Sequence, residues 1–206
     1  SSDGKIVAIG AHQHGSNSGH VRVYQYVSGL YGSEWIQVGY DLDGEATNNY
    51  FGHSVSLSKD GSVLVAGAYG YNSNTGRVYT YELIKQPTLK SIIKMGAPID
   101  AEAAGDQLGY ESGVSSNADG TIIAIGAQHN DGNGTSSGHV RVYKYNGSSW
   151  DQIGADIDGE AAEDRSGWSV SLSSDGTIVA IGAYGNDANG SNSGHVRVYD
   201  YVEGRT

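Results

Sequence analysis

Three features of the sequence predict an all-β fold. The 206-residue chain contains 32 glycines and only 2 prolines, a composition that favours many turns. Its apolar residues come in short bursts rather than in long helical stripes, and a unit of about 57 residues recurs along the chain. At this length the chain can bury a sizeable core, in one large all-β domain or in two small ones.

The recurring unit is clearest in a stretch of eleven residues that occurs twice. SSDGKIVAIGA opens the chain at Ser1–Ala11, and SSDGTIVAIGA stands at Ser173–Ala183. The Asp-Gly turns of four copies align at separations of 57, 59 and 56 residues, at Asp3, Asp60, Asp119 and Asp175. Because a fixed period of this size is typical of repeat architectures, we predict a single repeat domain over 1–206, with units at 1–50, 51–107, 108–165 and 166–206.

Each unit contains up to four strand-like segments, of which the first two form a hairpin. The first segment alternates apolar residues with serine, as a half-buried strand does, and occurs as SVSLS at Ser54–Ser58 and Ser169–Ser173. A tight Asp-Gly turn, which is a strong hairpin signal, leads to the second segment. The second segment is apolar on both faces and must be covered on both; it is found at Lys5–Gly10, Ser62–Gly67, Thr121–Gly126 and Thr177–Gly182.

The third and fourth segments complete the unit. In the third, valines take one face while arginine and tyrosines take the other, at His20–Tyr26, Arg77–Tyr81, His139–Tyr145 and His195–Tyr201. The fourth is amphipathic and predicted to be outermost, at Trp35–Gly39, Ser91–Gly96 and Trp150–Gly154. Four consecutive antiparallel strands that need neighbours on both faces describe the blade of a β-propeller. A parallel β-helix would use a shorter coil, and an immunoglobulin-like sandwich would not repeat itself.

The number of strands per blade has a consequence for assembly. About four blades are predicted, with three strands in the first, four in the second and third, and three in the last. The chain is therefore either part of a larger ring or a piece that a neighbouring copy completes. In both cases its ends are unpaired sheet edges, which soluble proteins normally cover.

The motifs of these strands resemble the FG-GAP repeat found in the propeller of integrin α subunits and related extracellular proteins. The resemblance is carried by Ser166-Gly-Trp-Ser-Val, Ile181-Gly-Ala and Gly194-His-Val-Arg-Val-Tyr, and in a second copy by Phe51-Gly52, Gly67-Ala68 and Gly76-Arg-Val-Tyr79. It covers nearly the whole chain and implies a propeller with an adhesive role and an extracellular or cell-surface location.

Two departures from the family pattern concern calcium and proline. The calcium-binding hairpin that the family carries between the first and second strands is replaced here by a short Asp-Gly turn, which argues against calcium at that position. The proline after Gly-Ala is replaced by His12, Tyr69, Gln128 and Tyr184.

The charge of the chain restricts its partners. The formal net charge is −11, from 23 acidic and 12 basic side chains. Such a chain repels phosphate backbones, so we expect no nucleic-acid partner and a better match to cations. No apolar run approaches the roughly 20 residues that span a bilayer, so we expect no membrane insertion. The chain has no cysteine, so cysteine usage gives no evidence about its cellular compartment.

The linkers between blades carry candidate calcium ligands. Acidic residues at relative positions 1, 3, 5 and 9 match the spacing of oxygen ligands in calcium loops, at Asp156, Asp158, Glu160 and Asp164, with Asp41, Asp43, Glu45 and Asn49 as a second set. In the intervening copy Pro98 removes the first ligand and leaves Asp100, Glu102 and Asp106. The alternative is that these residues turn the chain and pair with Arg22, Arg77, Arg141 and Arg197. The glycine at position 4, earlier than calcium loops place it, favours this structural interpretation.

The long polar loops between the second and third strands are the other candidate binding site. They run over residues 130–138 and 186–194, and their candidate ligand-binding residues are Asn130, Asp131, Asn133, Asn186, Asp187 and Asn189. Short polar side chains of this kind can bind sugar hydroxyls or a metal, and function often lies on such loops; the alternative is a solvated connection. Sequons at Asn133, Asn146 and Asn189 are candidate N-glycosylation sites.

Histidines and tryptophans repeat with the blades rather than cluster. His20, His139 and His195 precede the same strand and are expected to satisfy a turn, while the pair His12 and His14 is weak evidence for a metal. Trp35, Trp150 and Trp168 either pack between blades or stack on sugar rings.

These observations predict a noncatalytic extracellular or cell-surface propeller module for adhesion, protein interaction or surface assembly. A catalytic site needs different groups that converge, whereas nearly every polar residue here belongs to a repeated position, so no catalytic residue is assigned. Two alternatives stay open: a lectin that binds glycans through the repeated loops, and a structural subunit whose open ends join copies into a filament or a larger assembly. The expected partners are a protein or a glycan at the cell surface, or a second copy through open blade edges; calcium is the only cofactor considered.

Overall fold

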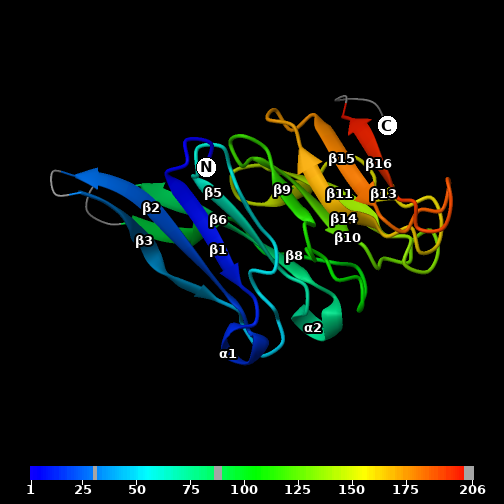
Figure 1. Ribbon diagram of the computed structural model, residues 1–206, viewed down its shortest axis with the longest axis horizontal. Helices are drawn as coiled ribbons and strands as arrows, with labels where there is room; N and C mark the ends of the chain where they lie inside the picture. The colour runs from blue at the N-terminus through cyan, green and yellow to red at the C-terminus, as the bar shows by residue number, and fades with distance from the viewer. Residues whose placement is uncertain (30–31, 86–89, 202–206) are drawn as a thin grey trace.

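Four antiparallel sheets follow one another along the chain and lie side by side in an open arc (Figure 1). The computed structural model describes residues 1–29, 32–85 and 90–201. Sheets 1 and 4 have three strands each, and sheets 2 and 3 have five. The predicted all-β fold is therefore confirmed.

The strand order in each sheet follows the chain. Sheet 1 consists of β1 (Ile6–Ala11), β2 (His20–Gly29) and β3 (Gly32–Asp43). Sheet 2 consists of β4 (Val55–Leu57), β5 (Val63–Ala68), β6 (Arg77–Lys85) and β7 (Lys90–Lys94), with β8 (Ile99–Asp100) also paired to β6. Sheet 3 repeats this with β9 (Val114–Ser116), β10 (Ile122–Ala127), β11 (His139–Tyr145), β12 (Trp150–Gln152) and β13 (Ile157–Asp158). Sheet 4 consists of β14 (Ser166–Leu172), β15 (Ile178–Ala183) and β16 (His195–Asp200).

Three hydrophobic cores lie between successive sheets. In β10, Ile123 and Ile125 belong to the core between sheets 2 and 3, while Ala124 belongs to the core between sheets 3 and 4. Successive side chains of a strand point to opposite faces, so this strand contributes to two cores at once. The prediction that the second strand of each unit is covered on both faces is confirmed for sheet 3.

Glycines allow the sheets to approach closely. A Cβ at Gly10 would lie 1.9 Å from the carbonyl oxygen of Gly52, and one at Gly126 would lie 2.1 Å from that of Gly167. The glycine near the end of one blade's second strand thus contacts the glycine that opens the next blade. A side chain at either position would force the sheets apart, which explains why each half of the motif contains a glycine.

Two short turns connect β1 to β2 in sheet 1 and β5 to β6 in sheet 2. They are α1 (His14–Asn17) and α2 (Tyr71–Asn74), and their central residues have positive φ, for example 60° at Ser16 and 58° at Ser73. They are therefore left-handed turns rather than ordinary helices. No helix in the described part of the chain is long and apolar enough to cross a membrane.

Sheet 4 leaves its outward face uncovered. Val196 and Val198 of β16 are 69% and 65% exposed, whereas Val140, at the equivalent position of β11, is completely buried under sheet 4. Sheet 1 leaves its opposite face open in the same way, and Ile9 there is half exposed. The arc therefore ends in two apolar faces of the kind that elsewhere pack between sheets.

Candidate functional site

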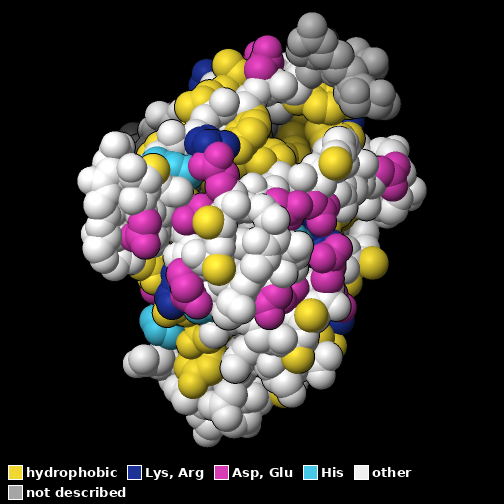
Figure 2. Space-filling view, turned by 90° about the vertical axis from the view of Figure 1, so that its right-hand side faces the viewer, with side chains coloured by type: hydrophobic (Ala, Val, Ile, Leu, Met, Phe, Trp, Pro, Cys, Tyr) yellow, Lys and Arg dark blue, Asp and Glu magenta, His cyan; other side chains and the backbone are white. Residues whose placement is uncertain are grey.

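A polar cleft of about 540 Å³ lies where the linker after sheet 2 meets a loop of sheet 3. Residues 102–107 form one wall, and residues 129–132, 135 and 136 line the other. The structure thus brings together one acidic linker and one polar loop, which the sequence had offered as separate candidates. The side of the molecule seen in Figure 2 carries many acidic side chains, shown in magenta, and few basic ones, in agreement with the negative charge of the chain.

Buried amide and carboxylate groups hold the cleft together. The Nδ2 of Asn130 donates a hydrogen bond to Oδ2 of Asp106, at 3.2 Å, and both side chains are buried. The Oδ1 of Asn130 accepts from the backbone N–H of Gly132, and Oδ1 of Asp131 accepts from that of Ser136. These bonds fix the loop on the linker and leave the exposed rim available for a ligand.

Sheet 4 repeats the same arrangement. Asn186 donates from Nδ2 to Oδ2 of Asp164, at 3.2 Å, and Asp187 accepts from the backbone N–H of Asn192. Asn130 and Asn186 therefore anchor the two loops in the same way. The carboxylate of Asp164 is occupied by its hydrogen bond with Asn186. Asn133 and Asn189 are exposed, but neither of them lines the cleft.

The first predicted calcium set is divided among different partners. Asp41 accepts two hydrogen bonds from Arg22, at 2.9 and 2.7 Å, and these bonds lower the pKa of Asp41 to about 2. Glu45 faces Arg77 and Lys94, Asn49 is buried, and Asp43 lies in β3 opposite His20. The set does not converge on one point.

The second predicted calcium set is divided in the same way. Glu160 pairs with Arg197, Asp158 lies in β13 opposite His139, and Asp164 anchors Asn186. Asp156 accepts from Nε2 of Gln152 at 2.6 Å. The linker forms a short strand where the sequence suggested a metal loop.

The recurring arginines do pair with linker carboxylates, but one of them stands at a different position from the others. Arg77 lies opposite Ala68 in sheet 2, as His139 lies opposite Ala127 in sheet 3. Arg77 is therefore equivalent to His139 and not to Arg141, which separates it from the other three arginines of the predicted group. In sheet 2 the Arg77 guanidinium lies between Asp100, 2.7 Å from Nη2, and Glu45, 3.5 Å from Nη1.

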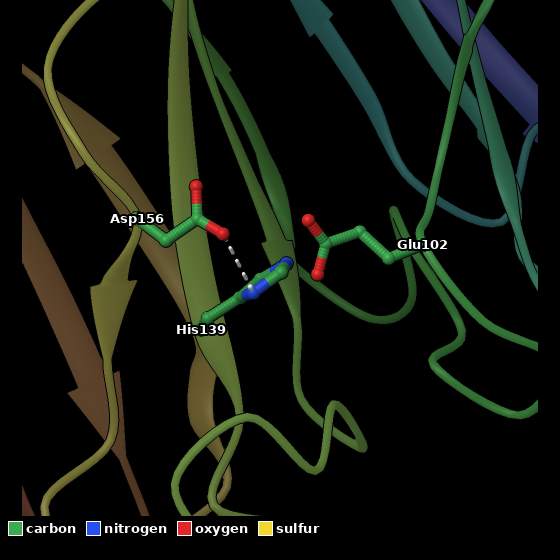
Figure 3. A group of neighbouring side chains, drawn as sticks. All are labelled: Glu102, His139 and Asp156. Atoms are coloured by element: carbon green, nitrogen blue, oxygen red, sulfur yellow. Dashed lines mark ion pairs between the residues drawn. The ribbon is translucent and has the colours of Figure 1, made fainter.

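In sheet 3, His139 lies between two carboxylates (Figure 3). Its ring Nδ1 is 3.7 Å from Oδ2 of Asp156, and Glu102 approaches from the linker of the preceding sheet. One potential ligand atom from each residue lies within 4.8 Å of the others. Burial and the nearby Arg141 lower the pKa of His139.

Sequence reasoning missed this group because its members come from three different segments. Asp156 was assigned to a calcium loop, His139 to a turn, and Glu102 to an incomplete linker. The signal that could have revealed this group is the repeat itself. In each case the glutamate of a linker lies beside the third strand of the following blade, as Glu102 does here. Glu160 lies beside Arg197 in the same manner.

A row of aromatic rings crosses the four sheets. Its centroids are 4.4 to 6.5 Å apart from neighbour to neighbour, and its members are His12, Tyr50, His53, Tyr69, Tyr110, Trp168 and Tyr184. Three of the residues that replace the family proline belong to this row; the fourth, Gln128, is buried, and its side-chain amide has no partner in the described part of the chain.

The three tryptophans have different environments. Trp168 belongs to the aromatic row, 4.4 Å from Tyr184. Trp150 donates from Nε1 to Oγ1 of Thr80, at 2.8 Å, and so joins sheets 2 and 3. Trp35 is 48% exposed and contacts Tyr26, which makes it the tryptophan accessible to a sugar ring.

The three sequon asparagines are exposed. The Nδ2 of Asn133 donates to the carbonyl oxygen of Gly159, at 2.8 Å, and that of Asn146 donates to Oδ2 of Asp151, at 2.7 Å. A glycan at either position would replace these hydrogen bonds.

Comparison with known proteins identifies the repeat. Residues 42–81 and 156–199 match the FG-GAP repeat family. Similar solved structures include TolB from Acinetobacter baumannii, with a TM-score of 0.53 and 11% identity over 100% of this chain and 41% of that one. Another is Kuenenia stuttgartiensis hydrazine synthase, with a TM-score of 0.53 and 14% identity over 98% of this chain and 57% of that one.

At these identities the structural likeness establishes the fold alone, and that fold is of the β-propeller type. This chain spans less than two thirds of either structure. No curated protein matches its sequence.

Proposed function

Because the chain carries FG-GAP repeats on a β-propeller-type fold, we propose that it is a noncatalytic interaction module of the extracellular space or cell surface that binds a protein partner in adhesion. FG-GAP repeats are typical of extracellular or surface proteins, and the acidic surface suits a partner of complementary charge.

The polar cleft carries this proposal. Its walls come from two blades, and the buried pair Asn130 and Asp106 fixes the loop on the linker. A fixed loop loses little conformational freedom on binding, which favours affinity. The exposed rim residue Thr135 offers a hydroxyl, and its side chain can be replaced without breaking the anchor.

One contact in the cleft involves a possible nucleophile. Nδ1 of His129 lies 3.2 Å from Oγ of Ser136. Both residues belong to the same loop, so the contact closes the loop, and a hydrolase would need in addition a group that orients the histidine and donors for an oxyanion. We expect no hydrolysis of activated esters; turnover by the wild type that Ser136→Ala abolishes would overturn the noncatalytic assignment.

Adhesion is tested with beads coated with the whole chain, on a panel of extracellular-matrix proteins and on a glycan array. Thr135→Arg, at the rim of the cleft, is expected to reduce retention at least tenfold. Ser191→Arg is the matched control, because Ser191 occupies the equivalent position in the loop of sheet 4 and lies outside the cleft.

Retention on matrix proteins that Thr135→Arg abolishes and Ser191→Arg preserves supports the proposal. Specific retention on glycans alone would instead establish the lectin alternative, with exposed Trp35 as the first residue to test. Retention on neither surface, or equal loss in the two variants, would refute binding through the cleft.

Self-assembly is a second candidate function, supported by the open faces of the arc. The outward face of sheet 4 presents Val196 and Val198, and the open face of sheet 1 presents Ile9. Within the chain, faces of these two kinds pack against each other three times, so a second copy can dock head to tail. Such a heterologous contact builds rings or filaments.

Sedimentation velocity at several concentrations tests this assembly. The wild type is expected to form larger species as concentration rises, and the double variant Val196→Glu, Val198→Glu to remain monomeric. Ile93→Glu is the control, since Ile93 is also exposed but lies on β7. A wild type that stays monomeric at every concentration would exclude assembly through these faces.

A further inference from the structure

We propose that Glu102, His139 and Asp156 bind a divalent transition-metal ion, with Zn²⁺ as the first candidate. Imidazole nitrogen with carboxylate oxygens is a ligand set that suits zinc and its neighbours, whereas calcium prefers oxygen alone. This site shares Glu102 with one wall of the cleft proposed for a protein partner, whereas His139 and Asp156 lie outside the cleft lining.

The spacing of the donors fits an ion between them. The separation of 3.7 Å between Nδ1 of His139 and Oδ2 of Asp156 exceeds the roughly 3.2 Å limit of a good N–H···O hydrogen bond. Two ligands about 2.1 Å from a tetrahedral zinc lie about 3.4 Å apart. The three donors lie within 4.8 Å of one another, so an ion at this place can reach His139 and Glu102, with Asp156 as a further ligand or as the partner that orients the imidazole.

An unsatisfied nitrogen supplies a second, independent observation. The His139 side chain is only 1% exposed, and its Nε2 is buried with no hydrogen-bond partner in the described part of the chain. An unpaired buried group of this kind is unfavourable, because it has lost its hydrogen bonds to water without gaining a partner. In Figure 3 the ring lies between the two carboxylates, with one nitrogen toward Asp156 and the other on the side of Glu102.

One ion binds only one ring nitrogen, and the unpartnered Nε2 favours the nitrogen on the Glu102 side. If the ion takes the nitrogen on the Glu102 side, the other N–H can donate to Asp156, and carboxylates commonly orient ligating histidines in this way. Replacing any of the three residues should then weaken binding, whether that residue ligates or orients.

Comparison of the blades supports a cation at this place. In sheet 2 the equivalent position is held by Arg77, whose guanidinium lies between Glu45 and Asp100. In sheet 3 His139 takes its place between two carboxylates, and a divalent ion would supply a positive charge there. Arg141 is the competing cation, with Nη1 3.8 Å from Glu102.

Two other blades provide incomplete copies of the site. His195 has Glu160 at 3.9 Å, but Glu160 is already paired with Arg197. His20 stands at the same strand position, but the nearby Asp41 is bound by Arg22. These two histidines are therefore matched controls for His139.

Isothermal titration of Zn²⁺ into the whole chain, with Ca²⁺ titrated in parallel, tests the proposal. We expect one equivalent of Zn²⁺, bound at least tenfold more weakly by His139→Gln and Glu102→Gln and unchanged in His195→Gln. Binding of Co²⁺ should give visible absorption bands that His139→Gln removes. Because Glu102 is exposed, Glu102→Gln still decides the question if His139→Gln fails to fold.

The proposal is overturned if the wild type binds no Zn²⁺, if it binds only Ca²⁺, or if His195→Gln weakens zinc binding as much as His139→Gln does. Unchanged affinity in Glu102→Gln would also overturn it.

Discussion

The contact between glycines of neighbouring blades predicts that one Gly→Ala substitution destabilises the protein and its counterpart does not. Gly126 lies opposite Val140 in sheet 3, and Gly182 lies opposite Val196 in sheet 4. Neither glycine has positive φ, so alanine can adopt the backbone conformation at both positions. Only the space around the new Cβ differs.

At Gly126 the added Cβ would lie 2.1 Å from the carbonyl oxygen of Gly167 and 2.9 Å from its Cα. Because real Cβ atoms essentially never come closer than 3.0 Å, sheets 3 and 4 must separate by about 1 Å. Overpacking costs about 1–3 kcal/mol, and separating the shared core adds to this, so we expect a loss of about 3 kcal/mol. For a chain of this size that is a fall in Tm of roughly 6–12 °C.

At Gly182 the closest atom to the added Cβ is Oγ of Ser169, at 2.5 Å, and the nearest backbone atom is 3.8 Å away. A serine hydroxyl can rotate away, and alanine reduces the entropy of the unfolded chain, so Gly182→Ala should change stability by less than about 1 kcal/mol.

Thermal unfolding of the two variants, followed by circular dichroism, compares them directly. Equal falls in Tm, or an unchanged Tm in Gly126→Ala, would refute the argument that close approach of the sheets requires glycine.

Two other predictions concern the core and an ion pair. Phe51→Ala should lower the free energy of unfolding in urea by about 3–5 kcal/mol, because Phe51 is buried against Tyr79, while Tyr40→Ala, at a 91% exposed residue, should change it little; equal effects would contradict this. Since hydrogen bonds from Arg22 lower the pKa of Asp41 from 3.8 to about 2, the ionised carboxylate stabilises the fold above that ordinary value, and this stabilisation is lost as the pH falls toward 2. The Tm advantage of the wild type over Asp41→Asn should therefore be greatest near neutral pH and vanish in acid, and an advantage independent of pH would contradict the pairing.

The repeat, the strands and their turns could be predicted from the sequence because they depend on local order. The Asp-Gly turn at Asp119, for example, is closed by its own carboxylate, which accepts from the backbone N–H of Thr121 two residues later. Alternating residues likewise assign each strand two faces whatever lies against them. The second strand of each unit is apolar on both faces, and this also predicted that each sheet packs between two others.

The linker shows what local reasoning leaves open. Its carboxylates match a calcium spacing along the chain, but in the structure Asp158 enters a strand opposite His139 and Glu160 pairs with Arg197. A spacing pattern assumes that the loop folds on itself, and here the loop extends along the neighbouring strand instead.

The sequence by itself therefore determined the strands and turns of each blade. The tertiary structure decided which side chains of different blades come into contact. Glu102, His139 and Asp156 come together because one sheet packs on the next and brings the linker of the first to the third strand of the second. Repeat period and composition contain no information about that packing distance. It depends on how closely Gly126 and its equivalents let the sheets approach.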